Sequence, residues 1–93
     1  MSDAIVLYCT SVTSSIEIKK EQQRIEMVLT GKGIAFEKVD ISLVEGAKEK
    51  MRELAGDKTA LPPQLCRGDK YLGNYKQFDE AIENEELNKF LQI

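Results

Sequence analysis

The chain has 93 residues, of which 42% are hydrophobic and 31% are charged, and its formal net charge is −3. This profile predicts one soluble globular domain that spans residues 1–93. Because the charge pattern supplies no basic face, we expect neither nucleic acid nor an anionic membrane as a partner. No apolar run approaches the roughly 20 residues of a membrane span. The chain has no histidine, which rules out a histidine base or zinc ligand, and we expect no metal site.

The cysteine content and the first residues indicate the compartment. Cys9 and Cys66 lie far apart in the sequence and form no Cys-x-x-Cys motif. Residues 1–4 have neither a basic region nor a long apolar core, so we expect no secretory signal. Both features favour a reduced cytoplasmic protein.

The first third of the chain predicts a strand, a loop and a helix. Residues 5–8 are apolar without alternating polar residues, which is typical of a strand buried on both faces. Residues 10–15 carry five hydroxyl side chains, which favour a loop and a helix N-cap. A helix is predicted from about residue 16 to residue 30, with Gly31 just past its end and an apolar face of Ile18, Ile25, Val28 and Leu29.

A second strand and a second helix follow. Residues 34–41 predict the strand, and a strand–helix–strand unit implies a parallel pair with a right-handed crossover. Ser42 and Glu45 have the spacing of a capping box. The helix that they open is predicted to end near Ala55, before Gly56, and to bury Val44, Ala47, Met51 and Leu54.

Both prolines of the chain stand together, directly before a short apolar run. An X–Pro bond adopts the cis form far more readily than other peptide bonds, and proline is tolerated where a strand begins. We therefore predict that Pro62 and Pro63 form a fixed corner that starts a strand at Gln64. An ordinary loop with two prolines is the alternative. Residues 64–67 and 70–72 then predict a hairpin, followed by a break at Gly73 and Asn74.

Asn74 and Gln77 predict the cap of a last helix, which residues 83–86 bend before Leu87. The predicted order is βαβαββα. This order, with a proline before the third strand, resembles the thioredoxin fold and its glutaredoxin branch over essentially the whole chain. The resemblance implies an α/β, thioredoxin-like fold with a central four-stranded mixed sheet flanked by helices. It also implies a single glutaredoxin-like domain.

In glutaredoxins, the first strand runs into a redox loop with the sequence Cys-Pro-Tyr-Cys. A cis-proline faces that loop, and a glycine turn before the last helix receives glutathione. By this resemblance Pro63 is the cis-proline and residues 72–74 form the glycine turn. The positions of the two redox cysteines hold Thr13 and Ile16, neither of which can form a thiolate. Ordinary glutaredoxin activity is therefore not expected, and we predict that the protein is not an enzyme.

The chain resembles more closely the SH3-domain-binding glutamic-acid-rich-like family, whose members are similar to glutaredoxin without its redox cysteines. The resembling positions are Tyr8 and residues 10–13, 16–19, 39–42, 51–56, 62–64 and 71–75. No glutamate-rich tail follows Ile93, so the chain is similar to the short form of the family. The resemblance implies a monomeric, cytoplasmic and also nuclear adaptor that modulates glutaredoxin or redox signalling and contacts the cytoskeleton.

The candidate site is the face that corresponds to the glutaredoxin active site, and it would bind other proteins. Its predicted residues are Thr10, Ser11, Val12, Thr13, Ser14, Pro62, Pro63, Gln64, Gly73, Asn74 and Tyr75. A purely structural role for these hydroxyls and prolines, as caps and as a corner, is the strongest alternative. SH3 recognition through residues 61–65 is not expected, because the chain contains no Pro-x-x-Pro.

We predict no cofactor, although weak glutathione binding through Gly73, Asn74 and the helix N-terminus stays open. Against it, Pro62 lacks the backbone N–H that glutaredoxins use there. A residual thiol protein that uses Cys9 or Cys66 with glutathione is the alternative function. We expect both cysteines to be packed as reduced thiols, although a disulfide between them is conceivable if their strands are neighbours.

Overall fold

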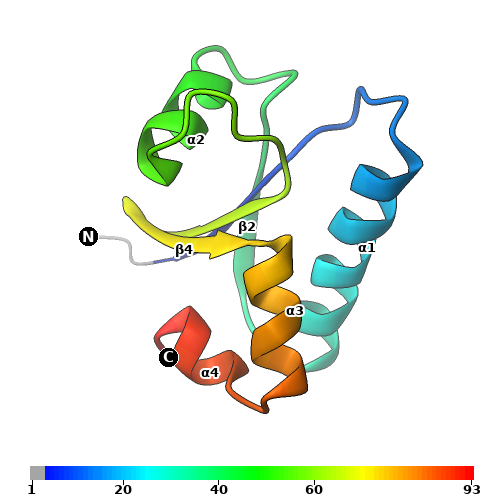
Figure 1. Ribbon diagram of the computed structural model, residues 1–93, viewed down its shortest axis with the longest axis vertical. Coiled ribbons are helices and arrows are strands. Elements are labelled where there is room, and N and C mark those ends of the chain that lie inside the picture. Colours follow the sequence, from blue (N-terminus) through cyan, green and yellow to red (C-terminus); the bar gives the residue numbers. More distant parts are fainter. Residues whose placement is uncertain (1–3) are drawn as a thin grey trace.

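The computed structural model describes residues 4–93 (Figure 1). Residues 1–3, which contributed to the expectation that no secretory signal is present, lie outside the described part. The elements, in chain order, are β1 (Ile5–Cys9), α1 (Ile16–Gly31), β2 (Phe36–Asp40), α2 (Ala47–Ala55), β3 (Gln64–Arg67), β4 (Lys70–Asn74), α3 (Tyr75–Glu83) and α4 (Leu87–Leu91).

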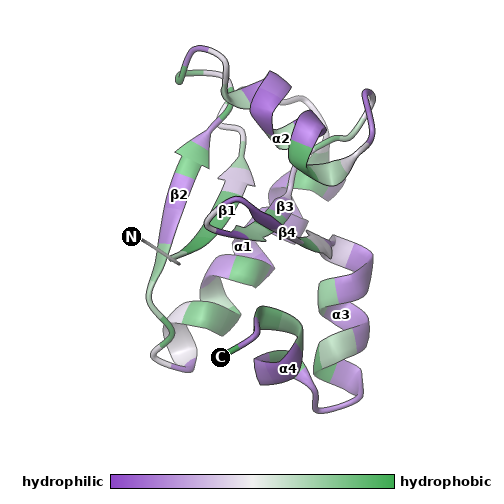
Figure 2. Ribbon diagram, turned by 90° about the vertical axis from the view of Figure 1, so that its left-hand side faces the viewer, coloured by the Kyte–Doolittle hydropathy of each residue, from purple (hydrophilic) through white to green (hydrophobic). Residues whose placement is uncertain are grey.

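The four strands form one sheet in the order β2-β1-β3-β4. Strand β1 pairs parallel with β2 and antiparallel with β3, and β3 pairs antiparallel with β4. This is the four-stranded mixed sheet that the resemblance to the thioredoxin fold implies. Helices α1, α3 and α4 pack on one face of the sheet and α2 covers the other (Figure 2).

Strand β1 runs through the middle of the core, and all five of its residues are buried. Since successive side chains of a strand point to opposite faces, β1 contributes to two separate clusters. The major core lies under α1, α3 and α4, and its buried residues are Ile5, Leu7, Cys9, Ile25, Leu29, Leu65, Phe78, Leu87 and Leu91. The minor core lies under α2, and its buried residues are Val6, Tyr8, Met51, Ala60 and Cys66.

Helix α1 begins where the hydroxyl-rich stretch predicts. The Ser15 side chain is its N-cap and accepts a hydrogen bond from the Ile18 amide at 3.2 Å. The prediction for its other end is wrong, because Gly31 is still helical and Lys32 is the C-cap. The Lys32 amide bonds to the Val28 carbonyl at 3.0 Å, and the chain reverses only at Gly33, where φ is +68°.

The predicted capping box at Ser42 is also wrong, because α2 begins only at Ala47. The Asp40 carboxylate accepts hydrogen bonds from the amide and the hydroxyl of Ser42, which hold this residue in a turn. Gly46, with φ of +79°, precedes the helix. Val44 is therefore half exposed instead of buried under the helix.

The C-terminal part departs from the predicted order in one respect. Asn74 and Gln77 form the predicted capping box of α3, directly after β4, which continues two residues further than expected. The predicted bend is a complete break, because Glu85 has a positive φ and the Glu86 amide bonds back to the Ala81 carbonyl at 2.7 Å. Residues 87–91 are thus a separate helix, and the order is βαβαββαα.

Candidate functional site

The loop after β1 is anchored by a side chain that the sequence analysis did not single out. Gln22 of α1 is buried, and its Oε1 accepts a hydrogen bond from the Thr10 amide at 2.8 Å. Its Nε2 donates to the Thr10 carbonyl at 3.1 Å. Gln22 stands four residues after Ile18 and three before Ile25, so a polar residue in the predicted apolar face was the signal that could have revealed it.

Asp40, at the end of β2, connects this loop to the one that follows β2. Its Oδ1 accepts hydrogen bonds from the backbone amides of Ser11, at 3.3 Å, and Ser42, at 2.9 Å. The hydroxyls of the two serines lie 3.3 Å apart. Burial by itself would raise the pKa of Asp40, but these hydrogen bonds outweigh it and lower the pKa to about 2. A charged Asp40 therefore holds both loops at the same end of the sheet.

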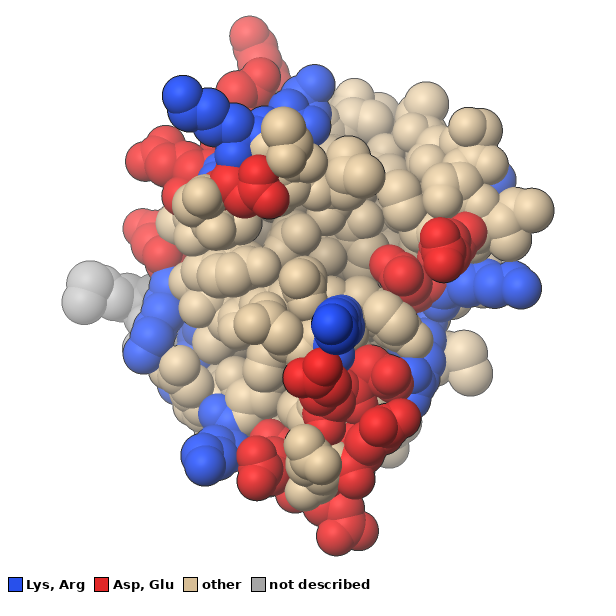
Figure 3. Space-filling view, in the orientation of Figure 1, with Lys and Arg blue, Asp and Glu red and all other residues tan. Residues whose placement is uncertain are grey.

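Four large apolar side chains are exposed on these two loops and the start of α1. They are Val12, Ile16, Leu43 and Val44, with exposed fractions of 73%, 67%, 76% and 50%. No charged residue occurs in residues 10–16 or 41–44. Figure 3 shows that the surface over the β1–α1 loop, at its upper right, is nearly free of charged side chains. We call these four residues the apolar tip.

Pro62 and Pro63 form the predicted corner. The peptide bond between them is cis, both residues are buried, and β3 starts directly after them at Gln64. The Gln64 side chain is satisfied inside the protein: its Nε2 donates to the Leu61 carbonyl at 2.7 Å, and its Oε1 accepts from the Tyr71 hydroxyl at 2.6 Å. Leu61, which directly precedes the corner in the chain, is 60% exposed.

A groove with a volume of about 350 Å³ runs beside the proline corner. It is lined by Glu17, Ile18, Glu21, Leu61, Pro62, Pro63, Gln64, Asn74, Tyr75 and Lys76. The structure thus brings together five of the predicted site residues here, from the corner and from the start of α3. The groove adjoins the apolar tip at the first turn of α1, where Ile16 belongs to the tip and Glu17 to the groove.

The other predicted residues do not line the groove. Val12 belongs to the apolar tip, and the hydroxyls near it make local hydrogen bonds. The Thr10 hydroxyl contacts the backbone of Val12 at 3.2 Å, and the Thr13 hydroxyl accepts from the Ser15 amide at 3.1 Å. Ser11 bonds to Asp40, as described above, and Ser14 is exposed. Gly73 is buried against Gln77 and Phe90.

Tyr75 is fixed in place by Arg24 of α1. The Arg24 guanidinium donates a hydrogen bond to the Tyr75 hydroxyl at 2.9 Å, lies 5.9 Å from the centre of its ring, and pairs with Asp79. Its contacts with both residues raise the pKa of Arg24. Helices α1 and α3 are thereby connected along the groove, and Tyr75 presents a fixed aromatic surface to it.

The two cysteines lie on opposite faces of the sheet, so the conceivable disulfide between them is excluded. Cys9 belongs to the major core and Cys66 to the minor core, and the strand neighbour of Cys66 is Val6, three residues from Cys9. Three residues along a strand span about 10 Å, which is beyond the reach of a disulfide. Burial raises the pKa of the Cys9 thiol and raises that of Cys66 to about 11.

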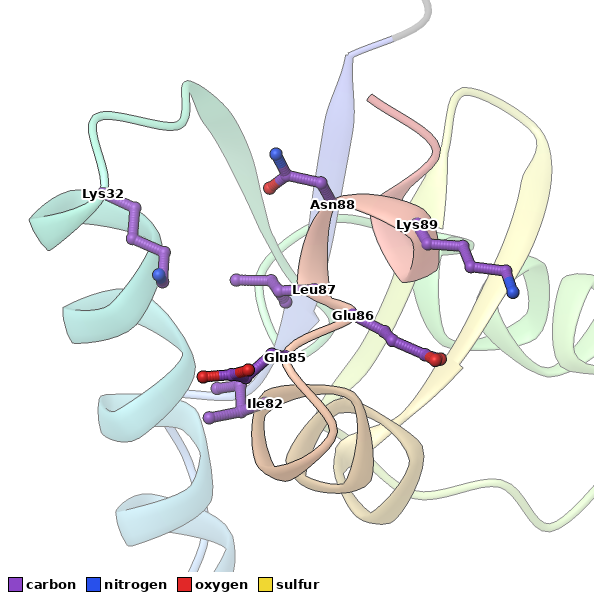
Figure 4. Close-up of a pocket in the computed structure, with 7 residues that line it drawn as sticks. All are labelled: Lys32, Ile82, Glu85, Glu86, Leu87, Asn88 and Lys89. Carbon is purple, nitrogen blue, oxygen red and sulfur yellow. The ribbon is translucent and has the colours of Figure 1, made fainter.

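A larger cavity, of about 680 Å³, lies at the other end of the molecule. Figure 4 shows Lys32, at the end of α1, pointing into the gap between α1 and the turn that joins α3 to α4, while Glu86 and Lys89 point away from it. Its lining mixes charges of both signs with only two apolar residues, Ile82 and Leu87. We therefore take the groove and the apolar tip as the candidate site, although this cavity is larger.

Residues 4–93 contain no cluster of three or more histidine, cysteine or acidic side chains that could hold a metal ion. Within the same residues, none of the helices has the length and apolar character that crossing a membrane would require.

Comparisons with known proteins give a consistent result. The family profile described as "SH3-binding, glutamic acid-rich protein" matches residues 3–93. The chain is 36% identical over 101 residues to the SH3 domain-binding glutamic acid-rich protein homolog of Drosophila melanogaster. That alignment covers 94% of this chain and 63% of the relative, so the chain spans less than two thirds of the relative's length.

Two solved structures illustrate the structural similarity. The C. albicans actin interacting protein Aip5 has a TM-score of 0.78 at 25% identity, over 95% of this chain and 87% of that one. The holo form of glutaredoxin C1 from Populus tremula x tremuloides has a TM-score of 0.70 at 19% identity, over 98% of this chain and 78% of that one. The thioredoxin-like fold expected from the sequence is confirmed.

Proposed function

The chain belongs to the family of SH3-binding, glutamic acid-rich proteins, and we propose that it is a non-catalytic adaptor that binds other proteins. The observation that carries this proposal is the apolar tip next to the groove. Four large apolar side chains are exposed to solvent there, on the start of α1 and on two loops that Asp40 and Gln22 hold in place. Exposed apolar surface of this kind marks protein interaction sites, and burying it against a partner would be favourable.

Two observations support the absence of thiol catalysis. A thioltransferase needs an accessible thiolate of lowered pKa at a helix N-terminus, and the chain has Thr13 and Ile16 at the corresponding positions. Its two thiols are buried, and burial raises the pKa of each. The alternative function, a residual thiol protein that uses Cys9 or Cys66, requires the opposite environment.

We propose that the partner is actin, in the cytoplasm. The similarity to a protein whose name describes it as actin interacting supports this choice. SH3 recognition, which the family name describes, is not assigned to the proline corner. SH3 domains bind prolines in an exposed extended helix, and here both prolines are buried.

Co-sedimentation with actin filaments tests the proposal. The wild-type protein should co-sediment, and the Val12→Ser/Leu43→Ser variant should lose most of that binding, because it removes apolar surface from the tip. Met27→Ser is the matched control, since Met27 is as exposed as Val12 but lies in the C-terminal half of α1, away from the tip, and it should bind like the wild type. Equal binding of all three proteins would contradict the role of the tip, and no binding of the wild type would contradict actin as the partner.

A second experiment separates the adaptor from the thiol alternative. The reduced protein should not accelerate the glutathione-dependent reduction of a small disulfide above the uncatalysed rate. Cys9→Ser and Cys66→Ser should behave like the wild type. Measurable turnover that either substitution abolishes would favour the residual thiol protein instead.

A further inference from the structure

The groove has an acidic wall on α1. Glu17 and Glu21 are four residues apart, so they lie next to each other on the same face of the helix, and both line the groove. Burial, and after it the charge of Glu17, raises the pKa of Glu21, as expected for two neighbouring carboxylates. Neither carboxylate takes part in an ion pair formed within residues 4–93. Figure 3 shows acidic side chains gathered over the first turns of α1 and again over α3.

The floor of the groove is apolar and offers few free polar groups. Leu61, Ile18 and the two prolines contribute aliphatic surface, and Tyr75 adds a fixed ring. The polar atoms of the Gln64 side chain already have partners inside the protein. Lys76 is the cationic side chain of the lining, so the groove holds two carboxylates against one ammonium group.

This combination disfavours an anionic ligand and suits a cationic side chain with a long aliphatic stem. Lysine and arginine bury their methylene groups on apolar surface while the charged end remains near a carboxylate. Glutathione carries two carboxylates and one ammonium group, so it would place net negative charge beside Glu17 and Glu21. The charge of the groove thus selects among partners by repulsion as well as by attraction.

We infer that the groove binds an extended segment of a partner protein in which a lysine or arginine side chain lies over Leu61 and Ile18 and ends at Glu17 and Glu21. This inference rests on the proposed adaptor function and specifies the chemistry of the segment that it recognises. The apolar tip would contact the folded body of the partner, and the groove would bind one positively charged segment of it.

Selection of random heptapeptides displayed on phage, with the whole protein immobilised, tests the inference. Selected peptides should be enriched in lysine and arginine over the unselected library. One enriched peptide, synthesised and titrated into the protein, should shift the backbone amides of residues 17–21, Leu61 and Tyr75. The Glu17→Gln/Glu21→Gln variant should bind it about tenfold more weakly, as expected from losing two partly exposed ion pairs.

The Glu49→Gln/Glu53→Gln variant is the matched control. These glutamates are also four residues apart, are exposed on α2 outside the groove, and change the net charge by the same amount. This variant should bind the peptide like the wild type. Equal weakening in both variants would show a general charge effect and overturn the inference.

The other outcomes distinguish the two proposals. Enriched peptides that are uncharged or acidic, yet shift the groove amides, would overturn the inference that the bound segment is cationic and would leave the adaptor function standing. Enriched peptides that shift only amides outside the groove would overturn the inference about the groove and leave the adaptor function standing. Failure to enrich any peptide would overturn the inference alone, since co-sedimentation tests the tip independently.

Discussion

At the scale of single residues, Gly73 has the most restricted environment in the candidate site. Its φ is +156°, a backbone conformation that residues other than glycine rarely adopt. A Cβ atom placed there would lie 2.5 Å from Gln77 Oε1 and 2.8 Å from Phe90 Cε1. Gln77 belongs to the capping box of α3 and Phe90 to α4, so both helices approach the backbone of β4 at this point. The role of Gly73 is therefore to permit this close packing.

Gly73→Ala should lower the free energy of unfolding by about 3 kcal/mol, because overpacking and an unfavourable backbone conformation add together. Gly33→Ala is the control, since Gly33 also has a positive φ but an added methyl group would meet nothing within 4 Å beyond its chain neighbours. It should lose only about 1 kcal/mol. Urea unfolding followed by circular dichroism measures both values. Similar losses would show that α3 and α4 move away from β4 without cost.

At the scale of elements, Asp40 connects the ends of β1 and β2. The pattern Ser42-x-x-Glu45 predicts a helix start, and it is misleading because Asp40, two residues earlier, bonds to Ser42 instead. Asp followed two residues later by serine is itself a turn signal, so the sequence is compatible both with a turn and with a helix start at this point. The same carboxylate also accepts a hydrogen bond from the Ser11 amide, 29 positions away in the chain, a contact that no local pattern predicts.

The lowered pKa of Asp40 makes the stability of this connection depend on pH. A carboxyl group with a folded-state pKa of about 2, below its usual 3.8, contributes stability above about pH 4 and loses it as the pH falls toward 2. Asp40→Asn should therefore lower the free energy of unfolding by about 1 kcal/mol near pH 7. The loss is small because the site is partly exposed to solvent. The difference from the wild type should shrink steadily between pH 4 and pH 2.

Unfolding free energies measured from pH 2 to pH 7 test this dependence. Ser42→Ala, which removes one hydroxyl donor but keeps the backbone amide, should show a smaller version of the same profile. A difference between Asp40→Asn and the wild type that stays constant over the whole range would mean that the charge of Asp40 does not matter to the folded state.

At the scale of the whole molecule, the sequence predicts the fold better than the site. The buried run of β1, the proline corner and the cap at Asn74 are local signals, and each is found where it was expected. The apolar tip and the acidic wall depend on how distant loops and helices meet. Glu17 and Glu21 look like ordinary solvent-facing residues of α1 until the proline corner is placed opposite them. No local pattern contains that information.

The division of the core into two layers also emerges only at this scale. The sheet separates a major core, covered by three helices, from a minor core covered by the nine-residue α2 and the segment that follows it. Each layer contains one cysteine, so the two thiols can report on the two layers separately. We expect α2 to detach from the sheet more easily than the rest of the molecule unfolds, because it buries few residues.

Labelling of Cys66 with a thiol reagent in a Cys9→Ser background tests this expectation. Met51 of α2 is fully buried, and its contacts break when α2 detaches. Met51→Ala should therefore lower the free energy of this opening by about 3 kcal/mol and speed the labelling about 100-fold. Leu91→Ala should destabilise the protein by a similar amount, because Leu91 is fully buried in the major core. It should nevertheless leave the labelling rate unchanged, since its contacts persist while α2 is open. If Leu91→Ala accelerates labelling as much as Met51→Ala does, Cys66 becomes accessible only by global unfolding, and the two layers form one cooperative unit.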